Sequence, residues 1–357
     1  MPSREDVLTV LSAIKDPDLG RDVVSLGMIK DLAISEAGRV TFTFELTTPA
    51  CPVRDRFQTL AHQLVSEIPG VTAVELKMTA NVRAAFDDRS PSASIPGVKH
   101  VIAVASGKGG VGKSTVAVNL AASLRQSGAR VGLLDADIYG PSVPGMLGME
   151  GQPVVHEGKL LPLDAHGMKV ISIGLLAGAD KAMVWRGPLV GRAIEQMLGD
   201  VWWGELDYLI VDLPPGTGDA SLTLGQAVRL TGVVIVCTPQ EAALKIALKA
   251  LQMFRGLNVP PLGLIENMSW FVCDDCGKEH FIFDHGRAER AAQRLGVPYL
   301  GAIPLDASIR EEADAGAPVV MSHPESKGAE ALRRVASALA ARVSVQSFRR
   351  LPVINVR

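Results

Sequence analysis

The spacing of apolar residues predicts a small mixed domain at the start of the chain. The pattern predicts a helix at Arg4–Ile14, strands at Ile29–Ser35 and Arg39–Leu46, a helix at Val53–Ile68 and a strand at Thr72–Met78. Gly38 marks a hairpin turn between the first two strands. We therefore expect a small α+β domain in this part of the chain.

After residue 98, short apolar runs alternate with helical stretches such as Ser114–Arg125. The expected strands are Val101–Ala105, Val131–Leu134, Tyr208–Val211, Val233–Cys237, Pro261–Glu266 and Tyr299–Ile303. Near-continuous apolar runs are typical of strands that are buried on both faces. The pattern predicts an α/β fold, a mostly parallel, doubly wound sheet with helices on both faces.

The segment between these two patterns, residues 88–98, has the Pro, Ser and Gly composition of a linker. A length of 357 residues also favours two domains. We therefore predict an N-terminal domain at 1–87, a linker at 88–98 and a larger domain at 99–357.

Composition narrows the classes of partner. A hydrophobic content of 47%, a charged content of 21% and a net charge of −2 indicate a globular protein without general attraction to nucleic acid or anionic membranes. No apolar run approaches the roughly 18 residues that span a bilayer, and the first residues contain no apolar signal core. We expect a cytoplasmic protein that binds neither nucleic acid nor membrane.

One glycine-rich loop carries most of the chemistry. Residues 107–114 match the phosphate-loop pattern G-x-x-x-x-G-K-[ST] and lie between an expected strand and an expected helix. The predicted nucleotide-binding residues are Gly107, Lys108, Gly109, Gly110, Val111, Gly112, Lys113, Ser114 and Thr115. In such loops backbone N–H groups surround the phosphates, so we expect Lys113 to reach the β- and γ-phosphates and Ser114 to bind Mg²⁺.

Acidic residues follow two of the expected strands. Asp212 comes directly after one strand and is the candidate Mg²⁺ ligand, acting through the metal's water shell. Asp137 is the candidate for orienting the attacking water, with Asp135 as a competitor for that role. Gly216 and Gly218 make the loop after Asp212 pliable enough to respond to the γ-phosphate.

These motifs resemble a known class of ATPases. Lys108–Ser114 is similar to the deviant phosphate loop of the MinD/ParA/ArsA class, and Leu134–Ser142 and Asp207–Asp219 resemble its Mrp/ApbC branch of iron–sulfur cluster carriers, over residues 99–345. Residues 4–80 resemble the DUF59-type domain of iron–sulfur assembly factors.

The resemblance implies a homodimer that hydrolyses ATP slowly and passes a labile [4Fe–4S] cluster to apo iron–sulfur proteins, with assembly factors as further partners. It implies that Lys108 reaches the partner subunit's nucleotide and acts with Lys113 and Asp137 in catalysis. By the same resemblance, Asn267 reads the adenine and the Pro304 region borders it.

Two cysteines, Cys273 and Cys276, have the spacing that lets two thiolates meet one metal centre. A symmetric dimer would bring in a second pair, and four thiolates suit a bridging [4Fe–4S] cluster, as the resemblance also implies. Zinc held with His280 and His285, or a redox pair without metal, stays open. The sequence departs from the usual family pattern at Asp274-Asp275 and at Asp284-His285.

Other features leave alternatives. Cys237 ends an apolar strand and is expected to be a buried, small apolar side chain. Cys51 precedes an expected helix, where a thiol has a lowered pKa, and is either a cluster or target contact or a structural thiol. A partitioning or positioning ATPase without a cluster is the rival function. The terminal segment 347–357 is too short to be a convincing membrane anchor.

Overall fold

A computed structural model describes residues 2–85, 94–177, 187–216, 218, 221–222, 224–225, 228–273 and 275–350. The chain forms two compact units. One comprises Met1–Arg83 together with Ala340–Arg357, and the other comprises Ala84–Leu339. Part of the expected linker, Asp219, Asp274 and residues 351–357 lie outside the described residues, so the domain boundaries at 87, 88–98 and 99 stay a prediction.

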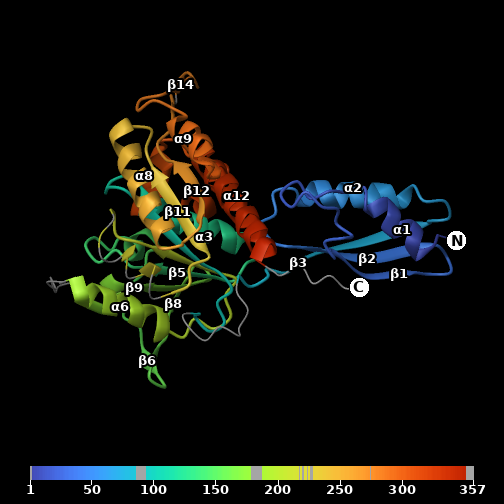
Figure 1. Cartoon of the computed structure of the whole chain (residues 1–357), viewed down its shortest axis with the longest axis horizontal. Coiled ribbons are helices and arrows are strands. Elements are labelled where there is room, and N and C mark those ends of the chain that lie inside the picture. The colour runs from blue at the N-terminus through green and yellow to red at the C-terminus, as the bar shows by residue number, and fades with distance from the viewer. Residues whose placement is uncertain are drawn as a thin grey trace. The chain divides into compact units, whose positions relative to one another are not determined.

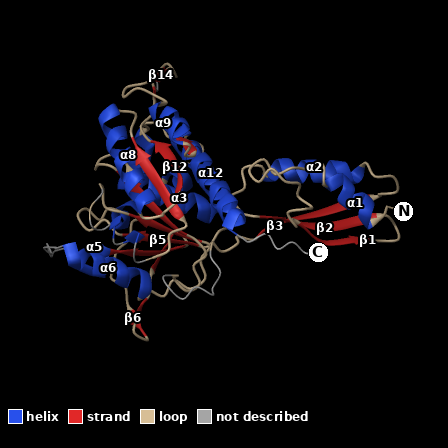
Figure 2. Cartoon of the chain, viewed as in Figure 1, coloured by secondary structure: helices blue, strands red, loops and turns tan. Residues whose placement is uncertain are grey.

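The N-terminal unit is a three-stranded sheet with two helices. Its elements are α1 (Arg4–Leu11), β1 (Ile29–Ile34), β2 (Arg39–Leu46), α2 (Arg54–Ser66) and β3 (Ala73–Ala80). The central strand β2 pairs with β1 antiparallel and with β3 parallel. Both helices cover one face of this sheet, with α1 against β1 and α2 against β3 (Figure 2). The expected α+β arrangement is thus present.

The core of this unit follows from period two in β2 and from helical spacing in α2. Phe42 and Phe44 are buried on the same face of the strand, and Phe57 of α2 stacks on Phe44 at 5.4 Å between ring centroids. The largest difference from the expected boundaries is at α1, which ends at Leu11 and not at Ile14, because Ile14 accepts a backbone hydrogen bond from Val23 in a pairing outside the helix. The ends of the other expected elements of this unit differ by no more than two residues.

The larger unit contains the remaining elements. They are β4 (Val101–Ser106), α3 (Lys113–Gln126), β5 (Val131–Asp135), α4 (Val143–Met146), β6 (Val155–His156), β7 (Lys159–Leu160), β8 (Leu163–Ala165), β9 (Met168–Ser172), α5 (Ile173–Ala177), α6 (Gly187–Gly199), β10 (Tyr208–Asp212), β11 (Gly232–Cys237), α8 (Glu241–Gly256), β12 (Pro261–Glu266), β13 (Phe271–Val272), β14 (Glu279–His280), α9 (Arg287–Leu295), β15 (Tyr299–Ala302), α10 (Ala307–Asp314), α11 (Val319–Ser322) and α12 (Lys327–Arg350). The last helix extends from this unit into the residues grouped with the N-terminal unit.

An eight-stranded sheet organises this unit, with strand order β15-β12-β11-β4-β10-β5-β9-β8. Figure 1 labels β12, β11, β5, β9 and β8 of this sheet. All neighbouring strands are parallel except β8, which pairs with β9 antiparallel at one edge. Helices α3, α8 and α9 pack on its strands. The expected fold class, a mostly parallel doubly wound sheet after a small α+β domain, is confirmed.

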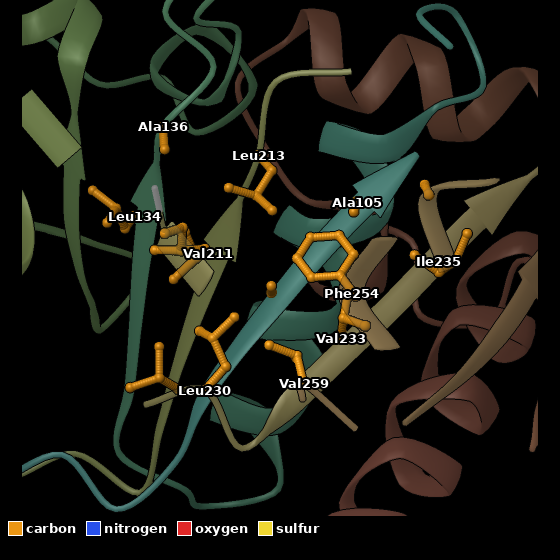
Figure 3. Close-up of a cluster of buried hydrophobic side chains, with 14 of the residues drawn as sticks. Ala105, Leu134, Ala136, Val211, Leu213, Leu230, Val233, Ile235, Phe254 and Val259 are labelled. Carbon is orange, nitrogen blue, oxygen red and sulfur yellow. The ribbon is translucent and has the colours of Figure 1, made fainter. Parts of the chain in front are cut away.

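Both faces of the central strands are buried. In β4, Val101, Ala103 and Ala105 join one core cluster with Phe254 of α8, and Figure 3 shows the Phe254 ring against these central strands. Ile102 points to the opposite face by the period-two rule and is also fully buried. This explains why the strands read as uninterrupted apolar runs in the sequence.

No helix in the described part of the chain is both long enough and apolar enough to cross a membrane.

We predict that Phe254→Ala destabilises the larger unit by about 3–5 kcal/mol, because a fully buried ring is replaced by a cavity. Urea unfolding followed by tryptophan fluorescence measures this unit, since all four tryptophans belong to it. The control Gln252→Ala, at an exposed position of the same helix, should change stability by no more than about 0.5 kcal/mol. Equal urea midpoints for Phe254→Ala and Gln252→Ala would contradict the packing of Phe254 in the core.

Candidate functional site

The phosphate loop connects the end of β4 to the start of α3, at the edge where the parallel strands have their carboxyl ends. Two of its glycines are required by geometry. Gly112 has a φ of +79°, and a Cβ there would collide with Nδ2 of Asn267. A Cβ on Gly107 would collide with the backbone of Ala247 in α8. The loop is therefore packed directly against two neighbouring segments.

Lys113 is the centre of the site. It is buried, and its Nζ lies 2.7 Å from Oδ1 of Asp212, 3.5 Å from Oδ2 of Asp137 and 3.3 Å from Oγ of Ser114. The four residues come from α3, from the end of β10 and from the loop after β5. The structure thus brings together the predicted phosphate-binding lysine, both predicted Mg²⁺ ligands and the predicted water-orienting aspartate.

The strand register explains this convergence. Asp212 and Asp135 are paired neighbours at the ends of β10 and β5. Burial raises the pKa of Asp212, although the ammonium group of Lys113 acts in the opposite direction. Burial, together with repulsion from Asp212, raises the pKa of Asp135 to about 7. Asp135 accepts hydrogen bonds from Ser172 Oγ at 2.9 Å and from the backbone N–H of Asp137 at 3.1 Å.

The arrangement has the chemistry that a hard divalent cation requires. Within the described part of the chain, Oδ2 of Asp212 and Oδ1 of Asp137 are buried and accept no hydrogen bond. Two carboxyl groups, those of Asp212 and Asp137, lie within 3.5 Å of the ammonium group of Lys113. Carboxylate and hydroxyl oxygens are ligands that Mg²⁺ prefers, so Asp212 and Ser114 fit this ion when bound nucleotide and water complete its shell.

Three predicted residues stand apart from this cluster. Lys108 is half-exposed, and its Nζ lies 3.4 Å from Oε1 of Gln240. Gly216, at a φ of +93°, donates a backbone hydrogen bond to Ser106 at 2.8 Å, which ties the loop after β10 to the end of β4. Gly218 is exposed.

A pocket of about 260 Å³ lies beside the phosphate loop. Gly112, Thr115, Asn267 and Pro304 are among its lining residues, so the two predicted adenine contacts share one cavity with the loop. Nδ2 of Asn267 donates to the carbonyl of Val111 at 2.8 Å. This leaves Asn267 tied to the loop on one side and facing the pocket on the other.

The same pocket is lined by residues that sequence reasoning missed. Met146 of α4, Met268 and Arg310 of α10 all border it. The first and last of these lie on helices far away in the sequence from Asn267, and no local motif marks them. They became visible only when the fold placed α4 and α10 next to each other.

The cysteine pair lies at the tip of a two-stranded hairpin formed by β13 and β14. Cys273 donates its backbone N–H to the carbonyl of Lys278 at 3.0 Å and accepts from Gly277 at 2.8 Å. Cys273 is half-buried and Cys276 is exposed. The described residues contain no group of three or more His, Cys, Asp or Glu side chains arranged to hold a metal ion. Within one chain, Cys273, Cys276, His280 and His285 are therefore not arranged as a metal site.

The hairpin's surroundings clarify the role of His285. Its Nδ1 lies 2.6 Å from Oγ of Ser269, and its ring lies 4.9 Å from that of Phe281. His285 is therefore engaged at the base of the hairpin in this chain rather than with the cysteines at its tip.

The prediction for one of the other two cysteines is confirmed, and the prediction for the second is not. Cys237 is buried at the end of β11, as expected, and burial raises its pKa to about 12. The expectation for Cys51 was wrong: burial raises the pKa of its thiol to about 11 instead of lowering it. Helix α2 begins only at Arg54, and Asp16 and Asp18 add repulsion, so the helix start does not activate this thiol.

A glycine loop between a buried parallel strand and a helix, with a lysine held among aspartates from neighbouring strands, defines a P-loop nucleoside triphosphatase domain. Residues 97–340 match the family described as NUBPL iron-transfer P-loop NTPases. The chain belongs to this family. Residues 4–76 match the family described as iron-sulfur cluster assembly proteins.

Curated relatives cover nearly the whole chain. The iron-sulfur cluster carrier protein of Deinococcus radiodurans is 51% identical over 97% of this chain and 97% of its own length. The protein of the same name from Synechocystis is 48% identical over 98% of this chain and 100% of its own length.

Solved structures match the larger unit's fold. A nucleotide-binding protein from Archaeoglobus fulgidus in complex with ADP has a TM-score of 0.58 and 40% identity, over 65% of this chain and 91% of that chain. The septum site-determining protein MinD of Pyrococcus horikoshii, complexed with Mg-ADP, has a TM-score of 0.51 and 24% identity, over 66% of this chain and 94% of that chain. At that identity the second match speaks for the fold alone.

The raised pKa of Asp135 leads to a pH-dependent prediction. The pKa of Asp135 is about 7 in the folded chain, against an ordinary value of 3.8 that applies to the unfolded chain. Between pH 3.8 and about pH 7, Asp135 is therefore protonated in the folded chain and deprotonated in the unfolded chain. The unfolding free energy therefore falls as pH rises through this window, by at most about 4 kcal/mol. Asp135→Asn removes this loss, so its stability relative to wild type should rise from about pH 4 to about pH 7 and then level off.

Urea unfolding of the nucleotide-free protein at several pH values measures this difference. The exposed Asp200→Asn variant of the same unit is the control and should follow the wild-type curve. Parallel curves for Asp135→Asn and wild type would show that this carboxyl does not titrate as described.

Proposed function

We propose that this protein is an ATP-hydrolysing iron–sulfur cluster carrier that works as a homodimer and delivers a [4Fe–4S] cluster to apoproteins. One observation carries the proposal. The hairpin with Cys273 and Cys276 begins at Phe271, the fourth residue after Asn267, which lines the pocket beside the phosphate loop. A nucleotide site and a thiolate pair thus share one short segment. The names of the two curated relatives support the same function.

The proposed ATP chemistry follows from the position of each group. Lys113 neutralises charge on the β- and γ-phosphates, and Ser114 and Asp212 hold Mg²⁺, which supplies charge neutralisation and orientation of the triphosphate. Asp137, whose Oδ1 accepts no hydrogen bond in the described chain, orients the attacking water. Asp135 is tied to Ser172 and positions the Asp137 backbone instead.

Closure of two copies around their nucleotides is the proposed role of Lys108. Its half-exposed side chain, close to Gln240 and away from the Lys113 cluster, is available to reach the partner's nucleotide. Loop movement at Gly216 would accompany the loss of the γ-phosphate. The nucleotide state would then be coupled to the affinity of the cluster site.

The cluster is the cargo of this proposed carrier. One chain offers two cysteine thiolates on its hairpin, and a [4Fe–4S] cluster takes four. A two-fold axis that brings the exposed Cys276 of two copies together would complete the set. The N-terminal domain, proposed at residues 1–87 before a linker at 88–98 and an ATPase domain at 99–357, would contact recipient apoproteins or assembly factors in the cytoplasm.

Anaerobic reconstitution followed by iron and acid-labile sulfide analysis tests the cluster. Wild type should contain about four iron and four sulfide per two chains, and a Cys273→Ala/Cys276→Ala double variant should contain neither, because it lacks the thiolate ligands. The control Cys51→Ala should keep full content, because its thiol is half-buried and has a raised pKa. About one zinc per chain without sulfide would overturn the proposal.

Phosphate release tests the ATPase. Asp212→Asn should lower the Mg²⁺-dependent rate by at least about 100-fold, because an amide cannot hold the metal's water shell as a carboxylate does. The exposed Glu205→Gln variant is the matched control and should keep the wild-type rate. An unchanged rate in Asp212→Asn would remove this residue from the proposed site.

A further inference from the structure

Glu266 is a buried carboxylate that the proposed ATP chemistry does not use. It ends β12 and has no exposed surface. Its Oε1 accepts hydrogen bonds from Ser269 Oγ at 2.6 Å and from the backbone N–H of Gly286 at 2.7 Å, and its Oε2 accepts from the N–H of Ala288 at 2.8 Å. A charged carboxylate with three donors at 2.6–2.8 Å is held strongly in place.

The donors lie at the two ends of one segment. Ser269 lies at the start of the segment that contains the cysteine hairpin, and Gly286 and Ala288 lie at its end, where α9 begins. Gly286 caps this helix at a φ of +71°, so the carboxylate also meets the positive end of the helix. One side chain therefore fixes both the departure and the return of the segment with Cys273 and Cys276.

His285 extends this network toward the surface. The single hydroxyl proton of Ser269 goes to Glu266, so Nδ1 of His285 is the donor in its 2.6 Å contact with Ser269 Oγ. The imidazole also lies edge-on to Trp270, with 6.3 Å between ring centroids, and its side chain is 45% exposed. It closes the base of the hairpin from the solvent side.

The backbone of Glu266 is hydrogen-bonded to a residue that lines the pocket beside the phosphate loop. The carbonyl of Glu266 accepts from the N–H of Ile303 at 2.9 Å, and Ile303 lines the pocket. The next residue, Asn267, donates its backbone N–H to Cys237 at 2.8 Å and its side-chain Nδ2 to Val111 of the phosphate loop at 2.8 Å. Glu266 is thus linked to the lining of the pocket through its backbone and to both ends of the hairpin segment through its side chain.

We propose that Glu266 is a positioning residue that transmits occupancy of the nucleotide pocket to the cysteine hairpin. A nucleotide that orders Asn267 and Ile303 also orders the backbone of Glu266. Its carboxylate then restrains both ends of the segment that carries Cys273 and Cys276 and reduces their local opening. This deepens the proposed function, on which it rests, by naming the route from nucleotide to thiolate.

The test uses the full-length, reduced, cluster-free protein and ADP as the probe. The rate at which iodoacetamide alkylates Cys276 is measured with and without ADP, and peptide mass spectrometry separates the four cysteines. In wild type, ADP should slow the alkylation by at least about threefold, because fewer open states are populated. ADP lacks the γ-phosphate that the proposed dimer closure needs, so a failure of cluster loading or ATP hydrolysis leaves this result interpretable.

Glu266→Gln replaces one acceptor oxygen by an NH₂ group that faces backbone N–H donors. We expect ADP affinity to stay within about twofold of wild type, while the slowing of alkylation by ADP disappears. If Glu266 only stabilised the fold, the variant would change both the ADP affinity and the slowing of alkylation, or neither of them. The exposed Glu289→Gln variant on α9, the helix at whose start Glu266 accepts its two backbone hydrogen bonds, is the matched control and should keep the full response.

Equal slowing in Glu266→Gln and wild type would overturn the proposal, as would a wild-type protein whose alkylation ignores bound ADP. If Glu266→Gln does not fold or does not bind ADP, Ser269→Ala decides the question. That variant keeps the two backbone donors to Glu266 and removes the Ser269 hydroxyl, with its contacts to Glu266 and His285. A response at least halved in Ser269→Ala supports the proposal, and a full response contradicts it.

Discussion

The ion pair between Lys113 and Asp212, 2.7 Å long and buried in the edge of the sheet, is the interaction on which the rest of the site depends. Removing either partner would leave an uncompensated buried charge, which typically costs about 3–5 kcal/mol. The pair also leaves one oxygen of Asp212 without a hydrogen bond in the described chain. The carboxyl groups of Asp212 and Asp137 thus share the one ammonium group of Lys113.

The parallel sheet creates this concentration of charge. Parallel strands place all their carboxyl ends at one edge, and the register of β10 against β5 sets Asp212 beside Asp135. On the other side of β10, beyond β4 and β11, β12 ends in Glu266. The acids at this edge differ in their compensation. Lys113 compensates Asp212, while backbone and hydroxyl donors compensate Glu266. The ion pair of Lys113 and Asp212 suits the exchange of a phosphate and a metal. The hydrogen-bonded Glu266 suits a side chain that holds neighbouring segments in place.

Much of this was predictable from the sequence because it depends on short-range patterns. Buried strands read as apolar runs, and the phosphate loop is a continuous motif. Asp212 was identifiable because it directly follows a strand. Residues such as Met146 and Arg310 were not, since their positions depend on how distant helices pack. The pKa of Cys51 was misjudged because burial and nearby acids outweigh proximity to a helix start. Glu266 looked like an ordinary strand end, and only its three donors give it a role.

The central claim of the proposed function is that two chains are needed to hold one cluster, because each hairpin offers two cysteines. Native mass spectrometry of the anaerobically reconstituted protein tests this directly. The account predicts a species with the mass of two 37.8 kDa chains plus one [4Fe–4S] cluster, which separates into apo monomers when the cluster is lost. A single chain that carries a complete cluster or one zinc ion would contradict it.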